Sequence, residues 1–265
     1  MANRDGVVMN PAARSHGAHG AEDIASAKER GWRDLAPIDD AYQAGKITTA
    51  EWHAAVLNVI EPAYLNGDNP RAQSGHSGDE TRWREARCLL VDLLPPNGGT
   101  FLDIGCANGH LMESLTVWAA EAGITIEPYG VEISAALADL ARTRCPQWAD
   151  RIWNANAMGW QPPHRFDVVR TGLDYVPGDL RGTYVAHLLN HVVAPGGRLI
   201  IGVYNEERHQ TTTQDLLRSC GYIPVGTTRA DHRHPEMQYK GLWLANTRSS
   251  QAVAAADGSG GSDAD

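Results

Sequence analysis

The sequence has few of the features that mark secreted, membrane or metal-clustered proteins. Only four of its 265 residues are cysteine, and none are paired at the Cys-x-x-Cys spacing of a zinc or redox site. Such scattered cysteines are typical of a reducing compartment. No apolar run approaches the roughly 20 residues of a membrane span, and the N-terminus lacks the apolar core of a signal peptide. We therefore expect a cytoplasmic protein without a membrane partner.

A basic excess is also missing. The formal net charge is −9 and the isoelectric point lies near 5.6, although the acids of the C-terminal tail account for part of the deficit. Nucleic-acid-binding domains usually have the opposite charge balance, so a nucleic-acid partner is disfavoured without being excluded. Hydrophobic residues make up 42% and charged residues 21%, which is typical of a globular fold.

Composition divides the chain into successive parts. Residues 1–30 are rich in alanine, glycine, histidine and charge, so we expect a disordered or loosely docked segment there. Residues 31–79 combine apolar positions at helical spacing with a polar loop, which predicts a helical cap and a lid. Residues 80–247 form the main domain, and residues 248–265 have the composition of a flexible linker.

The main domain alternates strand-like and helix-like segments. Strands are expected at Thr100–Ile104, Tyr129–Glu132, Arg151–Asn154, Phe166–Thr171, Arg198–Tyr204, Tyr222–Gly226 and Gly241–Asn246. Helices are expected at Leu111–Ala120, Ala135–Arg144, Leu180–His191 and Gln214–Cys220. A preceding helix should begin in a capping box of Ser77 and Glu80 and stop at Pro95. The alternation predicts an α/β fold with an open, doubly wound, mostly parallel seven-stranded sheet.

The most informative segment is the turn after the first strand, Asp103-Ile104-Gly105-Cys106-Ala107-Asn108-Gly109. Its glycines permit unusual backbone angles and a close approach of a ligand at the carboxyl end of the strand. The nicotinamide fingerprint G-x-G-x-x-G needs glycine where Ala107 stands, and the Asp103 carboxylate would repel a pyrophosphate. The pattern therefore favours a ligand with a cationic group over an anionic ligand. It also favours a ligand-binding turn over a tight turn that binds nothing.

Further elements follow in chain order. Glu132 ends the second strand at the distance at which an acid binds ribose hydroxyls; an acid at the N-terminus of the next helix is the alternative explanation. Asn156-Ala157 follows the third strand, where an amide can read an adenine edge or form a turn. Trp153 and Trp160 flank this pair and are candidates for the walls of an adenine pocket. Pro195-Gly196-Gly197 is a turn before a buried strand, with a mainly architectural role.

These elements together resemble the class I S-adenosylmethionine (SAM)-dependent methyltransferase family over about residues 80–246. The matching positions are Asp103-x-Gly105-x-x-x-Gly109, the ribose acid Glu132, Asn156-Ala157 (with Asn where an acid is commoner) and Pro195-Gly196-Gly197. A closer similarity, to actinomycete-type members of unassigned substrate, starts near Asn66 and includes Asn69-Pro70-x-x-Gln73-Ser74-Gly75-x-x-Gly78-Asp79-Glu80 and Phe166-Asp167-x-Val169-Arg170-Thr171. The resemblance implies a Rossmann-like methyltransferase fold, with SAM as methyl donor.

The resemblance and the residue patterns together predict one set of cofactor contacts: Gln73, Asp103, Gly105, Cys106, Ala107, Gly109, Glu132, Ile133, Asn156, Ala157 and Arg170. Gln73 belongs to the polar loop that we expect to act as a lid; the alternative is a long entry into the helix that follows. Arg170 ends the fourth strand, where it either binds an acidic group or bridges to a neighbouring acid. No metal is expected, because His187 and His191 have a possible ligand spacing but no third ligand.

The methyl acceptor should lie beyond the fourth strand, near Val169–Tyr175. Family members that methylate amino groups of nucleic acids carry a four-residue motif here: Asn or Asp, then Pro-Pro, then Tyr or Phe. This chain lacks the motif. Asp174 and Tyr175 are the candidates for a base or a substrate hydrogen bond; the alternatives are a helix-initiating turn and a core aromatic. We expect a small-molecule acceptor in specialised metabolism. An RNA or protein methyltransferase, a non-catalytic SAM-binding protein and a homodimer remain open.

Overall fold

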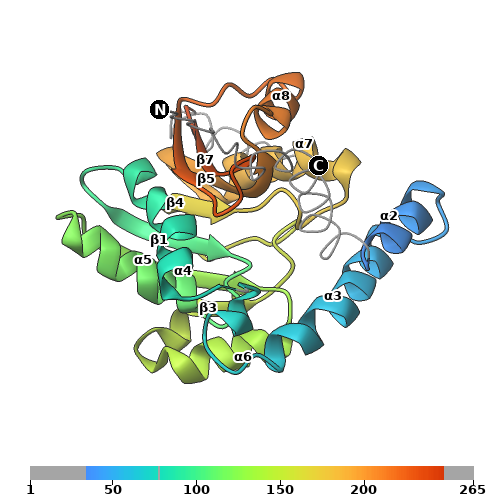
Figure 1. Ribbon diagram of the computed structural model, residues 1–265, viewed down its shortest axis with the longest axis horizontal. Coiled ribbons are helices and arrows are strands. Elements are labelled where there is room, and N and C mark those ends of the chain that lie inside the picture. The colour runs from blue at the N-terminus through green and yellow to red at the C-terminus, as the bar shows by residue number, and fades with distance from the viewer. Residues whose placement is uncertain (1–33, 77, 248–265) are drawn as a thin grey trace, which may run out of the picture.

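The computed structural model describes residues 34–76 and 78–247 (Figure 1). The expectations for residues 1–30 and 248–265, and for Ser77 as a helix cap, fall outside this part of the chain. None of the helices within it is long and apolar enough to cross a lipid bilayer.

A seven-stranded sheet forms the centre of the molecule. In spatial order its strands are β3 (Ile152–Asn154), β2 (Ile126–Glu132), β1 (Gly99–Ile104), β4 (Phe166–Thr171), β5 (Val193–Glu207), β7 (Met237–Ala245) and β6 (Gly226–Asp231). Strands β3 to β5 pair in parallel, and β7 runs antiparallel to both of its neighbours. The direction of winding reverses between β1 and β4, and such a switch point leaves a crevice at the carboxyl ends of the strands. The expected fold class is confirmed.

Helices cover both faces of the sheet because successive strand residues point to opposite sides. Phe101 of β1 and Ile200 of β5 pack against one layer, and Leu102 and Leu199 pack against the other. The first layer contains α4 (Glu80–Arg87), η2 (Cys88–Leu93) and α5 (His110–Glu121), extended by α6 (Ala135–Arg144) and η3 (Pro146–Arg151). The second contains α7 (Arg181–His187), the π-helical turn η5 (Leu188–Val192) and α8 (Thr212–Ser219), after the short η4 (Gly178–Leu180).

Some element boundaries differ from the sequence prediction. The strand expected at Tyr222–Gly226 was wrong: β6 begins only at Gly226, because Pro224 lacks the N–H that a strand ladder needs. Helix α4 begins at Glu80, and its N-cap is Asp79, whose side chain accepts a hydrogen bond from the Arg82 N–H at 2.9 Å. The expected role of Glu80 in a capping box is therefore corrected, since its carboxylate lies 2.6 Å from the Arg71 guanidinium.

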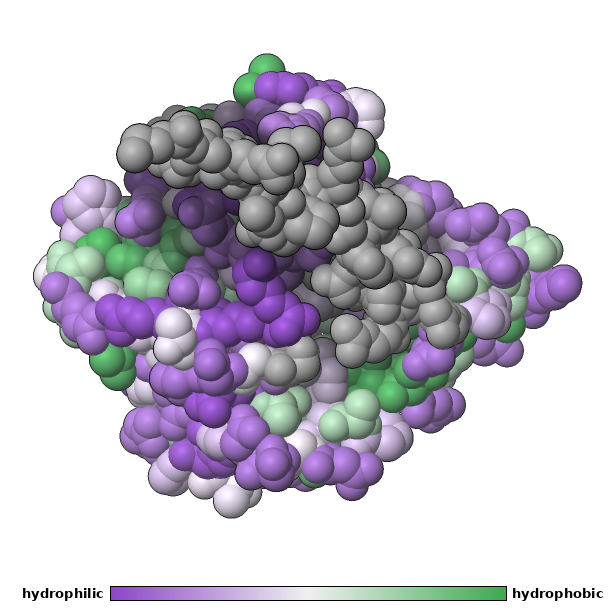
Figure 2. All heavy atoms as spheres, viewed as in Figure 1, coloured by the Kyte–Doolittle hydropathy of each residue, from purple (hydrophilic) through white to green (hydrophobic). Residues whose placement is uncertain are grey.

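Two helices, α2 (Ala36–Gln43) and α3 (Thr49–Leu65), precede the sheet in the segment where a cap was expected. Helix α3 begins in a capping box of Thr48 and Glu51, and it extends away from the sheet, with α2 folded against its outer end (Figure 1). The indole N–H of Trp52 donates to Asp39 at 2.7 Å and joins the two helices. The surface over part of α3 is apolar (Figure 2).

A buried ion pair connects β5 to β7. The Lys240 ammonium lies 2.6 Å from the Glu206 carboxylate, and both side chains are more than nine-tenths buried. Lys240 also donates to the carbonyl oxygens of Gln210 (2.5 Å) and Glu207 (3.2 Å), and Glu206 accepts from the Thr213 N–H (2.9 Å). The pair thus fixes the end of the antiparallel strand pair and the start of α8.

We expect Lys240→Met to lower the free energy of unfolding by about 3–5 kcal/mol, because it leaves the Glu206 carboxylate buried without a counter-charge. The double variant Glu206→Gln/Lys240→Met should recover most of this loss in urea unfolding. As a control, Arg218→Gln removes the exposed pair with Asp215 and should cost at most about 1 kcal/mol. Equal losses for Lys240→Met and Arg218→Gln would contradict the assignment.

Candidate functional site

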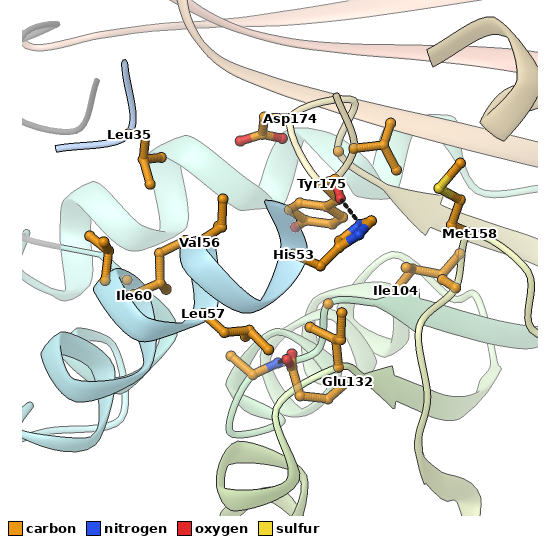
Figure 3. A pocket seen from close by; sticks show the side chains of 18 of the residues that line it. Leu35, His53, Val56, Leu57, Ile60, Ile104, Glu132, Met158, Asp174 and Tyr175 are labelled. Carbon is orange, nitrogen blue, oxygen red and sulfur yellow. Dashed lines mark hydrogen bonds between the residues drawn. The ribbon is translucent and has the colours of Figure 1, made fainter. Parts of the chain in front are cut away.

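A cavity of about 1780 Å³ opens at the carboxyl ends of the strands. Val56, Leu57 and Ile60 of the cap helix α3 line one side, and Glu132 and Tyr175 lie on the other (Figure 3). A pocket for one small ligand usually measures about 300–1,000 Å³. This cavity therefore has room for more than one small molecule.

The glycine turn after β1 has a strained backbone. Gly105 and Gly109 have φ of 70° and 78°, and Ala107, at φ 46°, is the one non-glycine residue in this region among those described. A left-handed conformation costs a residue with a Cβ roughly 1–2 kcal/mol. Such strain persists where the surroundings hold it in place. A Cβ on Gly105 would lie 2.8 Å from the Tyr175 ring, so glycine is required there.

Glu132 holds the strained turn in place. Its Oε2 accepts from the Ala107 N–H at 2.8 Å, and its Oε1 accepts from the Ser134 N–H at 3.0 Å, next to the start of α6. Burial raises the pKa of Glu132, while the two backbone donors act in the opposite direction. Glu132 therefore does lie beside the N-terminus of α6, as one of its two expected roles requires. It also lines the cavity, as the other role requires. Each carboxylate oxygen keeps a further lone pair for a ligand hydroxyl.

Asp103 and Arg170 form a buried ion pair between β1 and β4. The Arg170 Nη1 lies 3.1 Å from Asp103 Oδ1 and 3.2 Å from the Tyr175 hydroxyl, and Nη2 donates to the Tyr204 hydroxyl at 3.3 Å. Of the two roles expected for Arg170, the geometry matches the bridge to a neighbouring acid. Asp103 Oδ2 is buried and has no hydrogen-bond partner among the described residues, and burial raises the pKa of this carboxyl although Arg170 opposes the shift.

The loop expected to form a lid is hydrogen-bonded to the glycine turn. Ser74, at the end of η1 (Ala72–Ser74), donates to Asn108 Oδ1 at 2.7 Å, and Asn108 Nδ2 donates to the Pro70 carbonyl at 2.9 Å and to Gln73 Oε1 at 3.3 Å. Gln73 therefore braces the turn through Asn108 and, unlike Ser74 and His76, does not line the cavity.

The cavity brings together most of the residues singled out in the sequence: Asp103, Gly105, Cys106, Ala107, Glu132, Ile133, Asn156, Ala157, Arg170, Asp174 and Tyr175. Gly109 is outside the lining, because it is the N-cap of α5 and faces Cys145. Trp153 and Trp160 are not adenine walls: Trp153 stacks on Tyr129 and contacts Trp160 at the edge of the core.

The residues after β4 are joined to the cap. The ring Nε2 of His53, on α3, lies 3.2 Å from the Tyr175 carbonyl oxygen, and Nδ1 lies 2.9 Å from the Thr49 carbonyl (Figure 3). Asp174 is exposed beside the cavity, whereas burial raises the pKa of Tyr175 above its ordinary range. The Tyr175 phenol therefore keeps its proton at neutral pH. Sequence analysis missed His53, since a single histidine on an apolar helix carries no motif.

Two further histidines line the cavity near several arginines. Burial lowers the pKa of His76 to about 4, with Arg87, Arg82 and Arg71 adding to the effect. Burial, together with Arg82 and Arg233, likewise lowers the pKa of His232 to about 4. Both rings are neutral at pH 7. Within residues 34–76 and 78–247, no three His, Cys, Asp or Glu side chains gather as a metal site would require.

The lowered pKa of His76 predicts a loss of stability in acid. Between pH 6.5 and about 4, the unfolded chain binds a proton at this histidine that the folded state does not, so stability falls as the pH falls through this window. We expect His76→Asn to make the decline shallower by up to about 1.4 kcal/mol per pH unit. Urea unfolding at several pH values measures this. The exposed His209→Asn serves as the control, and the same slope in both variants would refute the prediction.

The sequence matches no protein-family model and no curated protein. Among solved structures, the chain is similar to Burkholderia thailandensis 1,6-didemethyltoxoflavin-N1-methyltransferase, which was crystallised with 1,6-didemethyltoxoflavin and S-adenosylhomocysteine (SAH). The two share a TM-score of 0.57 and 17% sequence identity, and the match covers 76% of this chain and 92% of that one. It is also similar to the (4+2)-cyclase SpnF: TM-score 0.50, 16% identity, over 71% and 93%. At these identities the similarity is one of fold.

Proposed function

We propose that the protein is a SAM-dependent methyltransferase whose acceptor is a small molecule of specialised metabolism. The observation that carries the proposal is the glycine turn at the end of β1, held by the buried Glu132 carboxylate at the head of a large cavity. The fold is shared with a methyltransferase crystallised with SAH, and this likeness supports the same ligand class here.

The chemistry of the lining residues fits SAM part by part. The free lone pairs of Glu132 suit ribose hydroxyls, and the unpartnered Oδ2 of Asp103 suits the ammonium group of the methionine tail. Asn156 and Ala157 lie where an adenine edge would be read, although Asn156 Oδ1 already accepts from the Met158 N–H at 3.0 Å. We propose these residues as the cofactor site, together with Gly105, Cys106, Ala107 and Ile133.

When bound, SAM supplies an electrophilic methyl group, and the protein must align a nucleophile with it and remove any proton that the nucleophile carries. Asp174 is an exposed carboxylate of the cavity lining directly after β4, next to Tyr175, so we assign it the proton-accepting role. Tyr175 keeps its proton and accepts a hydrogen bond from Arg170, and its ring packs over Gly105. It is therefore a positioning residue. Apolar side chains of α3 form part of the lining of this region.

The cap favours a small acceptor over a macromolecule. Helices α2 and α3 contribute lining residues along one side of the cavity, and His53 ties α3 to the residues after β4. An RNA or a folded protein would have to displace this cover. The (4+2)-cyclase among the similar structures is a reminder that one fold hosts different reactions. The assay must therefore detect transfer of the methyl group itself.

Calorimetry with SAH, followed by detection of SAH formed from SAM in the presence of cell metabolite extracts, tests the proposal. We expect SAH to bind and extract-dependent turnover to occur. A protein that fails to bind either SAM or SAH would refute the proposal. Turnover on folded tRNA or ribosomal subunits, but not with metabolites, would replace the small-molecule acceptor with a macromolecule. Binding without turnover on any acceptor would leave a SAM-binding protein.

Glu132→Gln should weaken SAH binding about tenfold or more. The glutamine amide cannot accept from both the Ala107 N–H and the Ser134 N–H and also bind a ribose hydroxyl. A hydrogen bond to a charged group contributes about 1.5–3 kcal/mol. Isothermal titration calorimetry measures the change. Glu127→Gln on the same strand is the control, since that acid pairs with Arg151 at the surface. If both variants bind SAH as tightly as the wild type, Glu132 does not contact the cofactor.

Asp174→Asn should lower kcat by about 10²–10⁴, as loss of a general base does, and leave the SAH affinity unchanged. Tyr175→Phe should retain the rate within about one order of magnitude, because the ring that packs over Gly105 remains. Asp179→Asn changes another exposed acid of the cavity wall, one that accepts from Tyr42, and serves as the control. The reverse order of effects would exchange the roles of Asp174 and Tyr175.

A further inference from the structure

Beyond the glycine turn, the cavity has a second region over β5 and β7, which we call the arginine arm. It is lined by Arg82 and Arg87 of α4, Tyr204 of β5, Tyr239 of β7, and His232 and Arg233 of the turn before β7. Adjacent strands lie about 4.7–4.9 Å apart, so β5 and β7 are roughly 10–15 Å from β1. The arm therefore lies on the far side of Arg170 and Tyr175 from the proposed cofactor site.

Arg87 has no counter-ion among the described residues. The guanidinium carbon lies 3.5 Å from the centre of the Tyr204 ring and 5.1 Å from that of Trp83, so the group packs against aromatic rings. Within the same part of the chain, its hydrogen bond is from Nη1 to the Ala86 carbonyl at 3.4 Å. Burial lowers the pKa of Arg87. A stacked guanidinium keeps its edge donors free for a planar oxyanion.

The rest of the arm is also positive. Arg82 donates to the Tyr239 hydroxyl at 3.2 Å, and neither it nor Arg233 pairs with an acid among the described residues. His76 Nε2, next to this region, is buried and has no hydrogen-bond partner there.

The acids that line the cavity elsewhere are mostly engaged. Asp103 pairs with Arg170, Asp39 accepts from Trp52, and Asp179 accepts from Tyr42. Arg82 and Arg87 are half-buried and Arg233 is exposed. A cation that loses part of its hydration without gaining an ion pair is costly, and an acidic ligand would supply the missing opposite charge.

We propose that the arginine arm binds an acidic group, a carboxylate or a phosphate, of the methyl acceptor. Arg87 takes the oxyanion through its guanidinium edge, with Arg82 and the neutral His76 as further donors. This inference rests on the proposed methyltransferase function and adds the class of acceptor to it. The acceptor is a small organic acid that reaches from the arm to the cofactor site, past Asp174 and Tyr175.

The acceptor class is tested with metabolites of less than about 1 kDa, separated on an anion exchanger and assayed for SAH formation. Turnover should come with the retained, acidic fraction. Turnover with the unretained fraction alone would overturn the acidic acceptor and leave the methyltransferase proposal intact. Failure to bind SAH would overturn the methyltransferase proposal itself. Prior phosphatase treatment abolishes turnover for a phosphate and spares it for a carboxylate.

Substitutions of the arginines test where the acidic group of the acceptor binds. Arg87→Gln should raise the acceptor KM about tenfold or more, with the SAH affinity unchanged, and Arg82→Gln should act in the same direction. Arg84→Gln is the matched control on the same helix, because Arg84 is exposed and paired with Glu121. If Arg87→Gln weakens SAH binding but spares 5′-methylthioadenosine, which lacks the amino-acid tail, Arg87 holds the methionine carboxylate and the inference is wrong.

Unfolding measurements separate a binding role of Arg87 from a structural one. Arg87 is half-buried without an ion pair among the described residues, so Arg87→Gln should cost no more than its contacts with Tyr204 and Trp83 contribute, about 0.5–2 kcal/mol, while the acceptor KM rises. A lowered midpoint, together with an unchanged acceptor KM, would assign Arg87 to packing against Tyr204 and Trp83.

Discussion

The hydrogen bonds of one buried carboxylate, Glu132, organise the carboxyl ends of β1 and β2 at the cavity. Through Ala107 it holds the turn after β1 in a strained conformation, and through Ser134 it fixes the start of α6. The same acid therefore joins β2, the turn after β1 and the next helix. Its desolvation is costly, and two backbone donors offset part of that cost. The shape of the proposed cofactor site thus depends on a group that also faces the ligand.

The second constraint is the central position of Arg170. Its guanidinium contacts Asp103 on β1, Tyr175 after β4 and Tyr204 on β5, so it connects the two regions of the cavity. The negative charge of Asp103 is consequently shared with an internal partner, and one carboxylate oxygen remains available. Sequence reasoning treated Asp103 as a free anion. The structure refines this, since only Oδ2 is without a partner among the described residues.

The fold was predictable because β1, β2 and β4 are short strands that are each followed by a helical segment, an alternation that can be read from the sequence. The positions of Asp103, Gly105, Cys106 and Ala107 at the cavity were predictable for a related reason: they lie close together in sequence around one turn. What failed depended on distant contacts. Gln73 braces Asn108, and Trp153 stacks on Tyr129, and neither contact leaves a local pattern. Arg87 and His53 face the cavity from α4 and α3, so their roles emerge only when those helices are placed over the sheet.

The two carbonyl contacts of His53 have a consequence for how the cap is joined to the sheet. The ring lies between the carbonyl of Thr49, within α3, and that of Tyr175, beyond β4, and each ring nitrogen can donate only if it carries a proton. With the N–H on Nε2 the ring donates across to the Tyr175 carbonyl, and with the N–H on Nδ1 it donates within its own helix. The hydrogen bond between α3 and the residues after β4 therefore depends on which ring nitrogen is protonated.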